Sequence, residues 1–320
     1  MDNDDFVDGT TPDRASDTES GDFSPFISDG TDSEYIAHPE TTYLKDVWRS
    51  FRSRKTAFVS FFILLLIVLL VIFGPMISKY NYYSNDYNAV NSSPSSTHWF
   101  GTDVLGRDLW TRVWVGGRVS LVIAILATII PYSIGMAVGG ISGYYGGKVD
   151  MVIMRLIDIL MGIPDMIYNI LLMMAMGSGN ISTLIIAFTI TGWLSSARTT
   201  RGLVLQLKTR EFVMASQTLG ASAPGIIFRH LIPNTLGISV VGMTMSIPGI
   251  IFAEAFLSFI GLGVAPPNPS WGQLIRTSSE VFKDYPYQFI IPCACISLTL
   301  LCFNLIGDGL RDALDPRLKS

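Results

Sequence analysis

Long apolar stretches without charged residues are the feature that most constrains this 320-residue chain. Residues 57–78, 119–147, 177–197 and 285–307 contain no charged side chain. Residues 151–176 and 236–260 are also apolar but include a few ionisable groups. About 20 apolar residues cross the hydrocarbon core of a bilayer as a helix, because each backbone N–H must be hydrogen-bonded within its own segment. The sequence therefore predicts an all-α integral membrane protein with six transmembrane helices, at about residues 57–78, 119–142, 151–176, 179–197, 236–258 and 286–308.

Positively charged residues divide unevenly between the predicted loops. The loops at residues 45–55, 148–155, 198–230 and 308–319 together carry 15 Lys or Arg residues, whereas the loops of the other side carry 6. Lys and Arg are retained on the cytoplasmic side of membranes. Six spans place both ends of the chain on one side, so the charge bias predicts that both termini are cytoplasmic.

The residues before the first span differ sharply in composition from the rest. Residues 1–42 hold 12 of the 26 acidic residues but only one basic residue, Arg14. Such a segment buries too little apolar surface to fold, which predicts a disordered acidic cytoplasmic tail. In residues 43–56, basic and apolar side chains alternate at helical spacing, which predicts an amphipathic helix on the cytoplasmic face of the membrane. Residues 57–320 form the predicted transmembrane domain.

The cytoplasmic loop at residues 199–235 has the spacing of two short helices. One helical face would consist of small or apolar side chains: Phe212, Ala215, Ser216 and Leu219. Gly220 stands where a left-handed residue would end that helix, and residues 222–230 can form a second helix before Pro233. An apolar face between Arg210 and Arg229 favours docking into the groove of a partner, the alternative being a helix that folds back onto its own bundle.

Polar residues inside the apolar spans are candidates for a translocation path. They are Asp165, Asn169, Glu254 and Asn304. Burial of such groups against lipid costs a few kcal/mol, so they are expected to face the interior or a water-filled path. For Glu254, packing or solvation at the interface is the alternative interpretation.

Glycines recur every four residues at Gly135 and Gly139 in the second predicted span and at Gly143 directly after it. Small side chains at this spacing let two helix backbones approach closely. The pattern predicts close packing of this span against a neighbouring helix.

The sequence contains no motif for catalysis or nucleotide binding. The stretch most similar to a phosphate-binding loop, residues 101–108 (GTDVLGRD), has Arg107 and Asp108 where the lysine and the hydroxyl residue are required. There is no G-x-S-x-G or H-E-x-x-H motif. The three cysteines of the chain lie in one apolar stretch without C-x-x-C spacing, which favours a role as small packing residues over a metal site. The chain is therefore predicted not to be an enzyme and to bind no metal.

The cytoplasmic loop resembles a known pattern. Residues 211–220 (EFVMASQTLG) and 226–234 (IIFRHLIPN) are similar to the EAA loop of ABC importer permeases, although Met214 stands at its glutamate position. Four further stretches resemble the C-type subunit of the oligopeptide and dipeptide permeases: residues 98–108, 143–155, 254–272 and 307–316. The resemblance covers about residues 43–320.

This resemblance implies a type I importer permease fold and a set of partners. These are a sister permease that completes a heterodimer, two ATP-binding subunits, an extracytoplasmic solute-binding protein and membrane lipid. The chain itself is expected to bind no cofactor, because ATP and magnesium belong to the ATPase subunits. The residues implied to couple to an ATPase are Glu211, Phe212, Met214, Ala215, Ser216, Leu219, Gly220, Ala221, Arg229, His230 and Pro233. The candidates for an outer docking rim are Asp103, Arg107, Asp108, Pro269 and Trp271.

The implied function is half of a translocation pathway for peptides across the cytoplasmic membrane, driven by ATP hydrolysis in other subunits. A related permease for nickel or another small solute is an alternative. A membrane-anchored helix-turn-helix regulator over residues 215–230 is an alternative of another class, but few basic side chains there would meet DNA phosphates, so no nucleic acid is expected. A self-sufficient carrier would show internal repeats, which are not evident.

Overall fold

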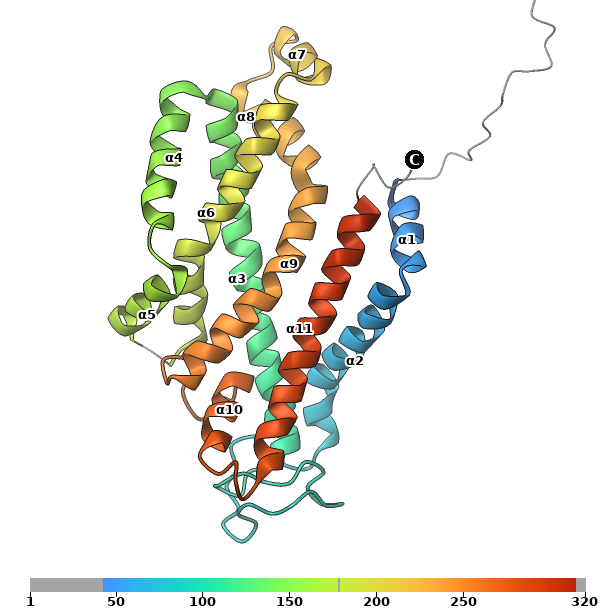
Figure 1. Ribbon diagram of the computed structural model, residues 1–320, viewed down its shortest axis with the longest axis vertical. Coiled ribbons are helices and arrows are strands. Elements are labelled where there is room, and N and C mark those ends of the chain that lie inside the picture. The colour runs from blue at the N-terminus through green and yellow to red at the C-terminus, as the bar shows by residue number, and fades with distance from the viewer. Residues whose placement is uncertain (1–42, 178, 315–320) are drawn as a thin grey trace, which may run out of the picture. The chain divides into compact units, whose positions relative to one another are not determined.

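The structure, a computed structural model, describes residues 43–177 and 179–314, so the predicted acidic tail at residues 1–42 lies outside the described part of the chain. Within that part the regular structure is helical, and β-pairing is confined to two isolated bridges. The prediction of an all-α fold is confirmed. The helices are α1 (Tyr43–Ser53), α2 (Lys55–Ile77), α3 (Leu109–Tyr145), α4 (Gly147–Met161), α5 (Asp165–Met176), α6 (Ile181–Leu207), α7 (Glu211–Thr218), α8 (Ala223–Ile226), η1 (Ile227–Leu231), α9 (Ile232–Phe259), α10 (Trp271–Ser279) and α11 (Pro286–Leu314) (Figure 1).

Five helical segments are long and apolar enough to cross a membrane: α2, α3, α6, the continuous run Ala223–Phe259, and α11. Helices α4 and α5 meet this condition only as a pair, and they are bent by 82° at their junction. Pro164 precedes α5 and disfavours helical geometry at the residue before it, which accounts for the break. The described residues therefore contain five candidate membrane spans, or six when the bent pair counts as one.

The second span begins earlier than its uncharged window predicts. Helix α3 starts at Leu109 rather than near residue 119, because the Asp108 side chain caps it by accepting a hydrogen bond from the Thr111 backbone N–H at 3.0 Å. Arg112 and Arg118 lie within the helix. The sequence window excluded them because it required an uncharged stretch, whereas a helix extends beyond the apolar part of its sequence.

The non-spanning segment is shorter than the predicted loop at residues 199–235, because the helices on both sides extend into it. Helix α6 continues to Leu207, and one helical run extends from Ala223 into α9, so Pro233 does not end a helix. The reason is the π-helical turn η1, at whose end the Ile232 N–H donates to the Ile227 carbonyl five residues earlier. This wider turn lets Pro233, which has no N–H, enter the first turn of α9 without ending the run.

Helices α3 and α6 are in close contact along the predicted glycine face. An added Cβ at Gly139 would lie 3.0 Å from the Arg201 backbone N and still closer to the Ala197 carbonyl oxygen. An added Cβ at Gly135 would likewise meet the Trp193 carbonyl oxygen at 2.6 Å. The predicted close approach of the second span to a neighbour is confirmed, and the neighbour is α6.

Gly139→Ala should lower the midpoint of thermal unfolding of the purified protein in detergent. The new methyl group fits only if α3 and α6 move apart, and overpacking of this kind costs about 1–3 kcal/mol. Gly202→Ala is the matched control on α6, where an added Cβ meets nothing within 4 Å. Equal midpoints for the two variants would contradict the close contact.

The two ends of the bundle carry different elements (Figure 1). Helices α1 and α7 and the end of α11 lie at one end, whereas α10 and the segment between α2 and α3 lie at the other. At the first end, Phe51, Ala57, Ile306 and Ala313 form a buried cluster, and Arg54 pairs with Asp312 at 2.7 Å. At the other end, buried residues of α2, α3, α9, α10 and α11 pack together around Trp114 and Trp271.

Candidate functional site

Helix α7 ends in a Schellman motif centred on Gly220. Gly220 has φ +79°, and its N–H donates to the Gln217 carbonyl at 2.9 Å. The next residue, Ala221, donates to the Ser216 carbonyl at 3.0 Å. These bonds satisfy carbonyls that the helix end would leave free, and they turn the chain into α8. The structure thus shows Gly220 in the left-handed conformation that the sequence predicts.

One side of α7 is anchored and the other is exposed. Val213 is fully buried in a cluster with residues of α6 and the 223–259 run. On the exposed side, Phe212, Met214 and Leu219 have 39%, 50% and 87% of their surface accessible. The hydroxyl of Ser216 donates within the helix to the Phe212 carbonyl at 2.8 Å, so it adds little polar capacity to this surface. A short helix with its apolar side uncovered is suited to insertion into a partner's groove.

The eleven residues implied to couple to an ATPase all retain accessible surface. Two of them, Ser216 and His230, are half-buried, and the other nine are exposed: Glu211, Phe212, Met214, Ala215, Leu219, Gly220, Ala221, Arg229 and Pro233. They lie on α7, on the turn after it, on η1 and on the first turn of α9. Their contact with an ATPase stays a prediction.

Polar contacts fix the base of α7 to the bundle. Lys208 Nζ donates to the Gly143 carbonyl at 3.1 Å, just before α7 begins. Arg201 on α6 forms an ion pair with Asp150 on α4, and the Ser142 hydroxyl donates to the same carboxylate at 2.6 Å. These residues connect the ends of α3, α4 and α6, so the segment that leads into α7 is fixed to the helix bundle. Sequence reasoning missed this ion pair, because its partners lie 51 residues apart without a local spacing signal.

A cavity of about 380 Å³ lies between α3, α5, α6 and α9. Two of the four path candidates line it: Asp165, which is exposed, and Asn169, which is buried. Its other polar lining residues are Thr128, Tyr132, Ser195 and Ser246, which sequence reasoning did not select. The signal that identified Asn169, a polar group within an apolar span, applies to them equally. The volume lies within the range of about 300–1,000 Å³ that ligand sites occupy.

The other two path candidates lie elsewhere. Glu254 is fully buried and accepts hydrogen bonds from the Ser120 hydroxyl at 2.9 Å and the Ser258 hydroxyl at 2.7 Å. It does not line the cavity, so the packing alternative describes its place in the structure. Asn304 is exposed on α11 and is also absent from the cavity wall.

The five candidates for an outer docking rim are buried within the chain itself: Asp103, Arg107, Asp108, Pro269 and Trp271. Arg107 Nε donates to Asp103 at 2.7 Å, and Asp108 accepts from the Thr111 hydroxyl at 2.7 Å and lies 2.9 Å from His98 Nδ1. Trp271 donates to the Val113 carbonyl at 2.9 Å. Apart from Pro269, these side chains make hydrogen bonds within the chain, in the segment between α2 and α3 and between α3 and α10. The existence of a rim stays a prediction.

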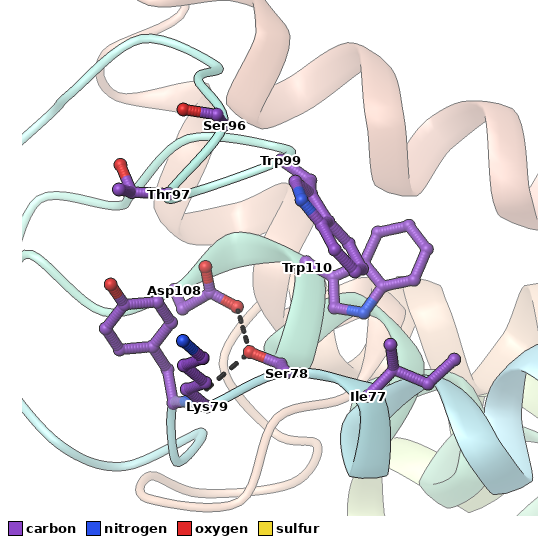
Figure 2. Close-up of a pocket in the computed structure, with 9 residues that line it drawn as sticks. Ile77, Ser78, Lys79, Ser96, Thr97, Trp99, Asp108 and Trp110 are labelled. Carbon is purple, nitrogen blue, oxygen red and sulfur yellow. Dashed lines mark hydrogen bonds between the residues drawn. The ribbon is translucent and has the colours of Figure 1, made fainter.

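A surface hollow lies beside this buried network (Figure 2). Trp99 and Trp110 form one wall, with their rings edge to face and the ring centroids 4.7 Å apart. In another wall, the Ser78 hydroxyl donates a hydrogen bond to the Asp108 carboxylate at 3.4 Å. The hollow measures about 180 Å³, less than ligand sites usually occupy. The cavity near Asp165 is therefore the stronger candidate for a solute.

Similar proteins were found for nearly the whole chain. Residues 135–320 match the family described as binding-protein-dependent transport system inner membrane component, and residues 42–94 match the N-terminal TM domain of oligopeptide transport permease C. The oligopeptide transport system permease protein OppC of Bacillus subtilis (strain 168) is 45% identical over 93% of this chain and 97% of its own length. The dipeptide transport system permease protein DppC of the same strain is 43% identical over 90% of each chain. OppC of Haemophilus influenzae is 42% identical over 85% of this chain and 88% of its own.

Proposed function

Because the chain belongs to the family of binding-protein-dependent transport system inner membrane components, we propose that it is one permease subunit of an ATP-driven peptide importer. A sister permease completes the pathway, two ATP-binding subunits supply the energy, and an external binding protein delivers the solute. The names of the relatives, oligopeptide and dipeptide permeases, favour peptides over nickel or another small solute. The chain is a non-catalytic subunit of the cytoplasmic membrane.

The observation that best supports this proposal is the exposed apolar surface of α7. The helix lies at one end of the bundle, between α6 and the 223–259 run in the chain (Figure 1). Its apolar side chains Phe212 and Met214 are exposed there. Those two helical segments also line the cavity, through Ser195 and Ser246. When ATP binding closes the ATPase subunits, a docked α7 moves with them and shifts both walls of the cavity. A hinge motion of this kind changes which side of the membrane the cavity faces.

We infer that α4 and α5 form one broken span, so that six spans bring both ends of the chain to one side of the membrane, and that this side is the cytoplasm. Helices α1 and α7 and the end of α11 then share the cytoplasmic end, consistent with their common position in Figure 1. The charge bias of the loops predicted from the sequence, 15 Lys or Arg residues against 6, supports the same orientation. The regulator alternative needs a separate recognition helix, whereas residues 223–259 run continuously into the apolar bundle.

Cysteine labelling tests both the orientation and the docking of α7. After replacement of Cys293, Cys295 and Cys302 by alanine, a membrane-impermeant maleimide should label Tyr87→Cys in intact cells. Tyr87 is 74% exposed in the segment between α2 and α3, which lies outside the membrane under the proposed topology. Leu219→Cys, at 87% exposure, should react only in inverted vesicles, and more slowly when the ATPase subunits are bound. Labelling of Leu219→Cys in intact cells would reverse the orientation, and labelling unaffected by the ATPases would contradict docking.

A further inference from the structure

Among the described residues that line the cavity between α3, α5, α6 and α9, the one charged side chain is acidic. Asp165 is the single ionisable acid among its lining residues, and none of the lining residues is Lys, Arg or His. Helices α3 and α9 contribute hydroxyl groups to the cavity lining, with the hydroxyl oxygens of Tyr132 and Ser246 3.3 Å apart. A carboxylate that faces a cavity and has no basic neighbour in its wall attracts a cation.

Asn169, which lines the same cavity, has a side-chain oxygen that accepts no hydrogen bond. It lies one turn after Asp165 on α5 and is only 4% exposed. Its Oδ1 has no hydrogen-bond partner among the described residues, which is rare for a buried polar atom. A rotation of the amide about χ2 exchanges the positions of oxygen and nitrogen. Because Oδ1 itself has almost no accessible surface, an incoming donor reaches this oxygen only after the amide rotates toward the cavity.

The position of Asp165 in the bundle restricts what can reach it. Helix α4 has 15 residues, so the break before Asp165 lies about 22 Å along the chain from the Gly147 end. The hydrocarbon core is about 30 Å thick, which places this carboxylate within the membrane under the proposed topology. An acid at that depth, at a break in a span, is expected to have a functional partner.

A second cavity, of about 280 Å³, adjoins the first through the shared residues Tyr132 and Met245. Its lining includes one charged residue, Arg311 on α11. A cation is attracted toward Asp165 and repelled from Arg311. The charge arrangement therefore favours the first cavity as the position of a positive group.

We propose that the cavity at Asp165 and Asn169 binds a primary ammonium group of the solute during its passage through the membrane. This inference rests on the proposed function as a peptide permease, and it names the part of the peptide that the chain recognises. The ammonium group belongs either to the amino terminus or to a lysine side chain. It donates to the Asp165 carboxylate and to the Asn169 amide oxygen, and the remaining peptide occupies the apolar part of the cavity.

The test is ATP-driven uptake of three peptides, Ala-Ala-Ala, Ala-Lys-Ala and Ala-Glu-Ala, by vesicles containing the complete transporter and its binding protein. Each variant is compared with wild type for the same peptide, so that the preference of the binding protein cancels. Asp165→Asn keeps the side-chain size but loses the charge, and it should lower uptake about tenfold, the value of one charge-assisted hydrogen bond. Asp165→Glu keeps the charge and should stay within about threefold of wild type.

The three peptides distinguish the two sources of the ammonium group. An equal fall for all three assigns the contact to the amino terminus, and a fall for Ala-Lys-Ala alone assigns it to the lysine side chain. Asp284→Asn, an exposed acid between α10 and α11, is the matched control for charge loss and should leave uptake unchanged. Uptake by Asp165→Asn within twofold of wild type for every peptide, or an equal fall for Asp165→Glu, would overturn the inference.

A second pair of variants tests the cavity without touching α5. Gly249 lines the cavity, and an added Cβ there meets nothing within 4 Å. Gly249→Lys introduces a tethered ammonium into the cavity that Asp165 lines and should lower uptake several-fold more than the neutral Gly249→Gln, whereas equal effects would count against the inference. If the wild-type complex takes up none of these peptides with ATP, the proposed function itself fails, a result distinct from unchanged uptake by the variants.

Discussion

Gly220→Val should strongly reduce ATP-dependent uptake while the complex still assembles. Gly220 has φ +79°, a region that a β-branched residue occupies at a cost of about 1–3 kcal/mol. At about 1.4 kcal/mol for each factor of ten, this strain lowers the population of the correctly shaped turn by roughly 5-fold to 150-fold. The two hydrogen bonds of the Schellman motif are lost with it, so α7 no longer meets the ATPase at its proper angle.

Uptake and ATP hydrolysis must be measured on the same vesicles. The expected signature is uncoupling, in which hydrolysis by the ATPase subunits continues while peptide uptake falls. Gly220→Asn is the matched control, because asparagine tolerates the left-handed region and should keep most of the uptake. An added Cβ at this position meets nothing within 4 Å, so the pair of variants tests backbone conformation and not a clash at Cβ. Normal uptake by Gly220→Val would exclude the turn as the coupling element.

The features that the sequence predicted well are those with local signals. The α7 turn is one, because a helical face followed by glycine specifies both the helix and the conformation of Gly220. The close contact of α3 with α6 is another, since glycines spaced by four residues leave room for a backbone. The predicted end of the second loop helix, before Pro233, was wrong, because the π turn that precedes Pro233 has no clear sequence signal.

The candidate site was only partly predictable, for a different reason. A polar residue within an apolar span indicates that it avoids lipid, but it does not tell a cavity from a buried hydrogen-bond network. Asp165 and Asn169 line the cavity, whereas Glu254 is held by serines on α3 and α9. The burial of the outer candidates Asp103 and Arg107 was likewise not predictable, since it depends on contacts that only the folded chain brings together.

Glu254 joins three helices, and Glu254→Ala should destabilise the protein more than any other single change considered. Its carboxylate holds Ser120 of α3 and Ser258 of α9. Ser120 in turn accepts the Trp271 backbone N–H at 3.2 Å, and Ser258 accepts the hydroxyl of Ser270, the residue that caps α10, at 3.3 Å. Truncation to alanine leaves these buried hydroxyls short of partners and opens a void, for a total cost of about 3–5 kcal/mol.

Thermal unfolding in detergent measures this cost, and Glu254→Gln separates its causes. Glutamine keeps the volume and one acceptor oxygen, and its amide can donate to a serine hydroxyl that reverses its own role. It should therefore stay within about 1 kcal/mol of wild type, whereas alanine lowers the midpoint by several degrees. A position on the solute path predicts the opposite pattern, in which the alanine variant keeps its stability and loses uptake. Because Glu254 has no exposed surface and lies outside the cavity wall, we expect stability to fall first, with any loss of uptake following from it.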